Sequence, residues 1–222
     1  VNGDFLVKKP KDITTKQAMI VGTAGFTALM CSFAVKAKEE LLLGEKVNNV
    51  LVTGATGGVG SIAVMVLAKL GYNVTAVTRK SEHNEYLKSI GAKNILNSND
   101  FEKDPRPLDK GLWDCAVDTV GGKILSNVLA QTKDNGIVAA CGNASDIKLN
   151  TTIIRGVKLW GINSVNTSKK RREFIWKEVS KLIDFEKLDK SIKVISLEEL
   201  IEVYPKMLKG ETSGRYIIDL QK

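Results

Sequence analysis

The hydrophobic positions of the chain form short apolar runs separated by longer stretches that close near a glycine. The longer stretches at 62–70, 82–90 and 123–133 predict helices. Strands and helices that alternate at this pace predict an α/β fold with a doubly wound parallel sheet. The short runs predict its strands, which would be covered on both faces; they occupy residues 50–52, 73–78, 92–96, 113–118, 136–143 and 159–164.

The first part of the chain predicts two helical pieces. The threonine pair 14–15 caps a helix over 17–21, and the small residues of 22–28 either continue that helix or kink it. A second helix over 29–43 ends at Gly44. The small residues would let a ligand approach the backbone, or would only let two helices pack closely, and spacing does not separate these alternatives.

The same part of the chain raises the question of a membrane span. No residue between Lys16 and Lys36 is charged, and this length approaches that of a spanning helix. Polar and small residues such as Thr23, Thr27 and Ser32 dilute the segment, which favours helices buried in an α/β protein. No signal peptide is visible.

The last part of the chain changes character. A long helix is predicted over 169–183, and Ser196 caps another over 197–209 that Pro205 ends or kinks. Residues 214–220 predict a terminal strand. This seventh strand exceeds a simple six-stranded unit, so we expect it to belong to another domain.

A glycine-rich turn follows the first strand and opens a helix. Without Cβ atoms, Gly57 and Gly58 let the backbone approach a pyrophosphate, and Gly60 lets the helix lie close to the strand. The helix N-terminus then offers free N–H groups to phosphates. The pattern departs from G-x-G-x-x-G because Ala55 takes the first glycine position. The alternative is a tight turn whose glycines serve packing alone.

The end of the next strand bears on the choice of cofactor. NAD-binding units usually place an acidic residue there to hold the ribose hydroxyls. This chain has Thr78, Arg79 and Lys80 instead, which suits the 2′-phosphate of NADP through charge-assisted hydrogen bonds. The alternative is an ordinary exposed basic loop.

Few residues offer other chemistry. Asp118 ends a strand at the ligand-binding edge and could act as an acid or base, but a carboxylate that caps the following helix is favoured. The single histidine, His83, argues against a His-based zinc site or a Ser-His-Asp triad. Three widely spaced cysteines indicate a reduced, intracellular chain with buried thiols; they are Cys31, Cys115 and Cys141.

The formal charge of +8 would suit nucleic acid, a membrane surface or a phosphate-rich ligand. The sharpest cationic cluster, 169–172, opens a helix and is followed by Glu173, which favours a solvated helix face. It lacks the interleaved aromatic residues that single-strand binders use. The charge therefore fits a phosphate-rich cofactor equally well.

The segments 22–28, 52–60, 85–92 and 117–121, together with Gly214-Arg215, resemble the medium-chain dehydrogenase/reductase superfamily. Within it the chain is most similar to the zinc-free group of acryloyl-CoA reductases and YhdH-type quinone oxidoreductases. The resemblance covers nearly the whole chain, with the motifs in the expected order. It implies a Rossmann fold that binds NADP(H), and NADPH-dependent reduction of an activated C=C bond in a 2-enoyl-CoA, an enone or a quinone.

The resemblance also implies roles for single residues. Thr56, Gly57, Gly58 and Val59 would cradle the pyrophosphate, and Thr78, Arg79 and Lys80 would hold the 2′-phosphate. The remaining cofactor contacts would be Thr119 near the adenosine or pyrophosphate, Thr27 in the nicotinamide pocket, Asn163 and Ser164 by the carboxamide, and Arg215 from the terminal strand. No catalytic acid is identified, and neither a metal nor a nucleic-acid partner is expected.

The resemblance further implies a domain organisation. Residues 1–22 would lead in from a GroES-like N-terminal domain, 23–165 would form the NADP-binding Rossmann domain, and 166–222 would return to the substrate domain. The family's GroES-like half is not in this sequence, so we expect the chain to be part of a longer protein. A cytoplasmic homodimer is expected.

Three functions follow as alternatives. The first is an NADPH-dependent enoyl or quinone reductase. The second is a nucleotide-binding module without catalysis, which would bind NADPH but turn nothing over. The third is a nucleic-acid binder that uses the basic surface.

Overall fold

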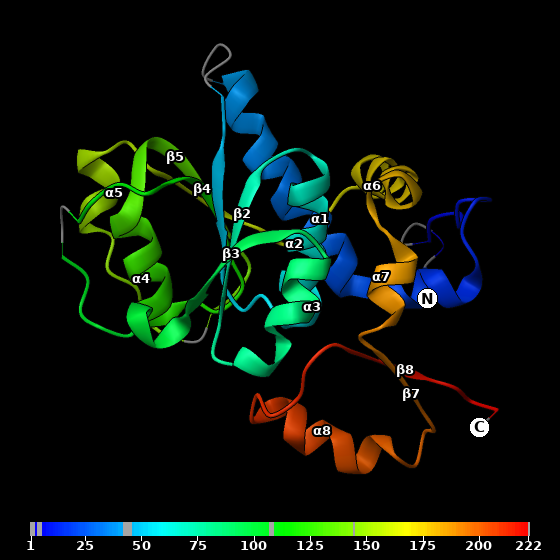
Figure 1. Ribbon diagram of the computed structural model, residues 1–222. Coiled ribbons are helices and arrows are strands. Elements are labelled where there is room, and N and C mark those ends of the chain that lie inside the picture. Colours follow the sequence, from blue (N-terminus) through cyan, green and yellow to red (C-terminus); the bar gives the residue numbers. More distant parts are fainter. Residues whose placement is uncertain (1–2, 4–5, 42–45, 107–108, 144, 222) are drawn as a thin grey trace.

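The computed structural model describes residues 3, 6–41, 46–106, 109–143 and 145–221. Its centre is a parallel six-stranded sheet with the order β3-β2-β1-β4-β5-β6 (Figure 1). The strand order reverses between β1 and β4, and ligands of such sheets bind at the carboxyl ends of the strands beside that reversal. The strands are β1 (Asn49–Val52), β2 (Asn73–Thr78), β3 (Ala92–Asn97), β4 (Trp113–Asp118), β5 (Thr132–Ala140) and β6 (Lys158–Gly161).

Helices cover both faces of this sheet (Figure 1). One face carries α1 (Thr15–Leu41) and α2 (Gly58–Lys69), and the other carries α4 (Gly122–Gln131). Shorter or peripheral helices complete the two layers; they are α3 (Asn84–Ser89), α5 (Asn150–Ile154), α6 (Lys169–Leu182) and α7 (Phe185–Asp189).

Successive strand residues point into two different cores. Val50 and Val52 of β1 pack in the core shared with α1 and α2, whereas Leu51 packs in the core shared with α4. All three side chains are fully buried. This arrangement explains why the strands read as continuous apolar runs, and it confirms the predicted doubly wound parallel sheet.

The long first helix is bent at Gly22, whose φ of 45° and ψ of −154° are not helical. The kink between 22 and 28 is therefore confirmed, but the second helix begins directly after Gly22 rather than at Leu29. A Cβ on Gly25 would lie 3.2 Å from Ile62 Cδ1 of α2, so at this position the small residue serves close helix packing. The predicted end of the helix at Gly44 lies outside the described residues.

By length and composition, α1 could cross a membrane, since an 18-residue window of it has a mean hydropathy of 1.8. However, 67% of that window is buried inside the protein. The apolar residues of α1 are those of a core helix that packs on α2 and on the sheet.

The last part of the chain forms a second, smaller sheet. β7 (Ile192–Ile195) and β8 (Arg215–Ile218) pair in parallel, and α8 (Leu200–Leu208) connects them. In Figure 1 this unit lies below the carboxyl ends of the large sheet. The terminal strand is thus confirmed as separate from the six-stranded sheet, whereas β7 was not predicted from the sequence.

The sequence made two predictions about α8, a cap at Ser196 and a stop or kink at Pro205. Ser196 and Glu199 form a capping box before the helix, with the Ser196 N–H donating to Glu199 Oε2 at 2.7 Å and the Glu199 N–H donating to Ser196 Oγ at 3.2 Å. Pro205 lies inside the helix, which continues to Leu208, so of the two predicted effects of Pro205, a stop or a kink, the stop is wrong. Because α8 is exposed, water can satisfy the carbonyl that Pro205 leaves without a donor.

Candidate functional site

The site begins where β1 and β4 end side by side. The Thr53 N–H donates to the Val117 carbonyl at 3.0 Å, and Thr53 Oγ1 donates to Asp118 Oδ1 at 2.6 Å. Thr119 completes the connection, because its N–H donates to Thr53 Oγ1 at 3.1 Å and its hydroxyl donates to the Thr53 carbonyl at 2.9 Å. These bonds fix the two turns that border the crevice.

Asp118 is fully buried and holds the turn before α4. Its Oδ2 accepts from the Gly121 N–H at 2.7 Å and from the Val120 N–H at 3.3 Å. Burial raises the pKa of Asp118, against the lowering effect of the Thr53, Gly121 and Val120 donors. These bonds hold the turn that leads into α4, but α4 itself has no side-chain hydrogen bond at its N-cap, Gly121, so the predicted helix-capping role is wrong.

The glycine turn has structural features that suit both of the alternatives, close packing and phosphate binding. A Cβ on Gly60 would lie 2.3 Å from the Gly54 carbonyl oxygen, so Gly60 is required for packing. By contrast, Gly57 is exposed and precedes α2 with no side-chain cap on the helix. The N-terminus of α2 therefore has no side-chain cap, and Gly57 before it lines the crevice, as a phosphate-binding turn requires.

A cavity of about 380 Å³ opens beside this turn. Six of the predicted cofactor residues line it, namely Thr56, Gly57, Thr78, Arg79, Lys80 and Thr119. The other lining residues were not predicted for the site; they include Val77, Ser98, Glu102, Ile124, Gly210 and Thr212. Ser98 directly follows β3, so its place at the carboxyl end of a strand was an available signal.

Hydroxyl and ammonium groups organise the outer end of the cavity. Thr56 Oγ1 lies 3.2 Å from Thr78 Oγ1, which also accepts from the Lys80 N–H at 3.0 Å. The Lys80 ammonium donates to the Thr212 carbonyl, so the loop between α8 and β8 forms part of the wall. Arg79 is exposed at the rim. The pair of cations therefore lies at a built cavity and not on an isolated loop.

Two buried polar atoms near this crevice have no hydrogen-bond partner in the described part of the chain: Ser98 Oγ and Arg215 Nε. Ser98 is only 6% exposed and lines the cavity. Because an unpaired buried polar group is costly, these two atoms suit a ligand that would supply the missing partners.

Arg215 reaches the same region from β8. Its Nη1 would lie 3.0 Å from a Cβ on Gly58, the first residue of α2, and its Nη2 would lie 3.0 Å from a Cβ on Gly22. Burial lowers the pKa of Arg215, although the guanidinium stays charged. A cation beside the N-terminus of α2 reinforces the preference of this turn for an anion.

The three residues predicted for the nicotinamide, Thr27, Asn163 and Ser164, are not among the residues that line this cavity. β6 ends at Gly161, so Asn163 and Ser164 are on a loop and not on the predicted strand. Asn163 Oδ1 accepts from the N–H groups of Val165 at 3.0 Å and Asn166 at 3.2 Å, which explains why the chain turns there. Thr27 is buried in α1, and its hydroxyl donates to the Thr23 carbonyl at 2.8 Å.

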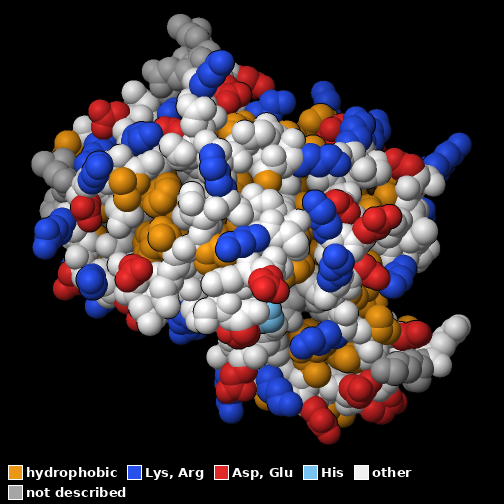
Figure 2. Space-filling view, in the orientation of Figure 1, with side chains coloured by type: hydrophobic (Ala, Val, Ile, Leu, Met, Phe, Trp, Pro, Cys, Tyr) orange, Lys and Arg blue, Asp and Glu red, His pale blue; other side chains and the backbone are white. Residues whose placement is uncertain are grey.

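The predicted solvated face at 169–172 is only partly correct. Lys169, Lys170 and Arg171 are exposed, but Arg172 turns back onto the loop that precedes its helix. Elsewhere Figure 2 shows Lys and Arg side chains interspersed with Asp and Glu over the face it displays. The fit to a metal is poor, since no group of three or more His, Cys, Asp or Glu side chains among the described residues could hold an ion.

Comparison with known proteins agrees with this geometry. Residues 58–185 match the family model for the zinc-binding dehydrogenases. The chain is 42% identical to the acrylyl-CoA reductase AcuI of Ruegeria pomeroyi, a match that covers 99% of this chain and 67% of that protein. The chain thus spans about two thirds of the relative's length.

Solved structures extend the comparison. The YhdH oxidoreductase from Salmonella enterica, solved in complex with NADP, superposes with a TM-score of 0.91 at 38% identity, over 98% of this chain and 67% of that one. YhfP of Bacillus subtilis, solved with NAD bound, gives a TM-score of 0.89 at 38% identity, over 99% of this chain and 68% of that one. The chain therefore belongs to the zinc-binding dehydrogenase family of the medium-chain dehydrogenase/reductase superfamily, in the group that contains the acrylyl-CoA reductases and the YhdH-type oxidoreductases.

Proposed function

We propose that this chain is the cofactor-binding part of an NADPH-dependent reductase of activated C=C bonds, with a 2-enoyl-CoA such as acryloyl-CoA, or a quinone or enone, as substrate. The observation that carries the proposal is the cavity at the strand reversal, where Thr78, Arg79 and Lys80 stand in place of the acidic residue of NAD-binding units. The acrylyl-CoA reductase relative and the NADP-bound YhdH structure support it.

The chain's own residues would hold the cofactor along the crevice. The α2 N-terminus would bind the pyrophosphate through the segment from Thr56 to Val59, with Arg215 as counter-ion. Thr78, Arg79 and Lys80 would bind the 2′-phosphate, and Thr119 would lie near the adenosine. Thr27, Asn163 and Ser164 would face the nicotinamide.

When bound, NADPH supplies the hydride that the β-carbon of the unsaturated substrate accepts. The task of the chain is to fix the cofactor so that the reacting atoms meet in a productive geometry. The described residues include no group that we assign as the proton donor.

We also propose that the protein is a cytoplasmic homodimer. Within the described ranges, β6 is an edge strand of the large sheet, because it pairs only with β5. Large apolar side chains lie exposed on this strand and on α5, which precedes it in the chain: Trp160 of β6 is 37% exposed, and Ile153 and Ile154 of α5 are 87% and 63% exposed. An antiparallel pairing of two β6 edges would bury these side chains and satisfy the free backbone groups.

Oxidation of NADPH by the full-length enzyme, followed by absorbance with acryloyl-CoA and with a quinone, tests the catalytic proposal. We expect turnover of at least one of these substrates, with NADPH preferred over NADH. Binding of NADPH without turnover of any enoyl thioester, enone or quinone would instead establish the non-catalytic nucleotide-binding module. Failure to bind either cofactor would contradict both.

A further inference from the structure

Arg172 lies in the first turn of α6, directly after Arg171, whose side chain is exposed to solvent. Its guanidinium instead donates hydrogen bonds to three backbone carbonyls of the preceding loop. Nε donates to the Thr167 carbonyl at 2.9 Å, and Nη2 donates to the carbonyls of Val165 at 2.6 Å and Ser164 at 3.4 Å. The planar fork of an arginine can serve several acceptors in this way, whereas a lysine ammonium cannot match its geometry.

The same guanidinium contacts α1. Its central carbon lies 5.8 Å from the centroid of the Phe26 ring, which is within the range of a cation–π interaction. Phe26 is 5% exposed and directly precedes Thr27. A second, weaker contact joins the same two elements, because the Thr167 hydroxyl lies 3.7 Å from the Met30 sulfur.

Arg172 therefore connects the two elements that carry the proposed nicotinamide residues. On one side it holds the loop that contains Asn163 and Ser164, and on the other it packs on the residue next to Thr27. The turn made by Asn163 shapes the loop locally but does not attach it to α1. Ile162 anchors the start of the loop in the core shared with α1, and Arg172 and the weak sulfur contact of Thr167 attach the loop itself.

We infer that Arg172 is a positioning residue: it fixes the 163–167 loop against α1 so that both elements form one wall for the nicotinamide half of the cofactor. This inference rests on the proposed function. Arg172 itself does not contact the cofactor. The adenosine half of the site should not depend on Arg172, because other elements line the cavity at Thr78 and Lys80.

The test compares R172A and R172K with R171A in the full-length enzyme. Arg171 is exposed and differs from Arg172 in its surroundings, so R171A controls for the loss of one positive charge on the same helix. Three quantities are measured: the Kd of adenosine 2′,5′-bisphosphate, which has no nicotinamide, the KM of NADPH, and kcat with the best enoyl or quinone substrate.

For R172A we expect kcat to fall by about 10-fold to 100-fold, as small misplacements of reacting groups do. The Kd of adenosine 2′,5′-bisphosphate should stay within about 2-fold of wild type, and the KM of NADPH should change less than kcat. R172K should lower kcat by an intermediate factor, because it keeps the charge over Phe26 but loses the fork. R171A should behave like wild type.

Two results for R172A would overturn the inference: an unchanged kcat, or a loss of affinity for adenosine 2′,5′-bisphosphate as large as the loss of kcat. Should R172A fail to fold, R172K decides the matter: a wild-type kcat at a wild-type Tm overturns the inference, and a lowered kcat at a wild-type Tm supports it. The proposed function fails in a different way, because the wild-type protein itself would then bind neither adenosine 2′,5′-bisphosphate nor NADPH, or would bind NADPH and turn over no substrate.

Discussion

The two ends of β4 carry buried aspartates with opposite behaviour. Asp114, at the amino end, accepts from the N–H groups of Asn48 at 2.9 Å and Asn49 at 2.8 Å and from the Lys133 ammonium at 2.9 Å. Burial raises the pKa of Asp114, but these donors outweigh it and the net pKa is lowered. At the carboxyl end, burial prevails and the pKa of Asp118 is raised.

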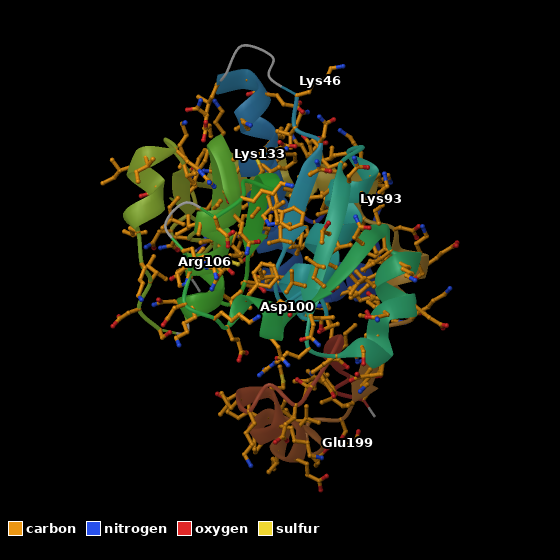
Figure 3. All side chains as sticks on the ribbon, turned by 60° about the vertical axis from the view of Figure 1, so that its left-hand side comes forward. Lys46, Lys93, Asp100, Arg106, Lys133 and Glu199 are labelled. Atoms are coloured by element: carbon orange, nitrogen blue, oxygen red, sulfur yellow. The ribbon has the colours of Figure 1, made fainter. Side chains whose placement is uncertain are left out.

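The two ends of the sheet differ in whether their buried polar groups have hydrogen-bond partners within the protein. Figure 3 shows Lys133 and Asp100 toward opposite ends of the sheet, Lys133 on the side of Asp114 and Asp100 in the turn after β3. The polar groups around Asp114 satisfy one another. The groups at the other end include Ser98 and Arg215, which each retain a buried atom without a partner in the described residues. A cavity also lies at the amino end, lined by Asp114 and Lys133 among others, so the unsatisfied buried groups, and not a cavity alone, point to a ligand site at the carboxyl end.

The largest expected effect concerns the cations of the carboxyl end. The double variant R79A/K80A should lose about 100-fold or more in NADPH affinity relative to NADH, since each charge-assisted bond to the 2′-phosphate contributes about 1.5–3 kcal/mol. Calorimetric titration with both cofactors measures this ratio. K93A removes a cation near the start of β3 and should leave the ratio unchanged. Equal losses for both cofactors would show that Arg79 and Lys80 do not bind the 2′-phosphate.

The next effect concerns the stability that Asp114 and Asp118 contribute, which should change with pH in opposite directions. D114N should lower the free energy of unfolding by about 1–3 kcal/mol at pH 7, because charged hydrogen bonds are lost. Since the folded pKa of Asp114 is lowered, its contribution is complete above the unfolded value of about 3.9 and disappears as pH falls through the folded pKa. The stability of wild type relative to D114N should therefore shrink in acid.

Asp118 should show the reverse trend. Its folded pKa is raised, so the folded state binds the proton more tightly, and the stability of wild type relative to D118N should grow as pH falls through that pKa. Urea unfolding of wild type, D114N and D118N would measure both trends. A range from about pH 3 to about pH 7 includes the pH values at which carboxyl groups titrate. Parallel trends in the two variants would contradict the contrast drawn between the two ends of β4.

The smallest effect distinguishes a free serine from a satisfied one. S98A should weaken NADPH binding by about 2-fold to 10-fold, the equivalent of one neutral hydrogen bond, and should leave the free energy of unfolding nearly unchanged. Ser126, which is also buried, donates to the Gly122 carbonyl at 3.0 Å and accepts from the Lys148 N–H at 2.9 Å. S126A should lower stability, as urea unfolding would measure. A loss of stability without weaker binding in S98A would contradict the assignment of Ser98 to the cofactor site.

The sequence predicted what local patterns determine. The apolar runs predicted the six strands of the large sheet, because burial on both faces demands them, and the glycine turn and Thr78-Arg79-Lys80 predicted where the cavity lies. β7 was missed because Lys193 interrupts a run of only four residues.

Contacts between distant segments could not be predicted in this way. The bond from Lys80 to Thr212 spans 132 positions, and no periodicity indicates it. Arg172 belongs to a basic cluster, and composition alone could not show which of its members turns inward. The position of Ser98 after a strand could have marked it as a candidate, but only the structure shows that its hydroxyl lacks a partner in the described residues.

The central claim is that the crevice beside the glycine turn binds a dinucleotide with a 2′-phosphate. Titration of the wild-type protein with NADPH and NADH tests it directly, because the two ligands differ only in that phosphate. We predict binding of NADPH that is at least about 10-fold tighter, as a charge-assisted bond requires. Equal affinity for the two cofactors, or tighter binding of NADH, would contradict the account.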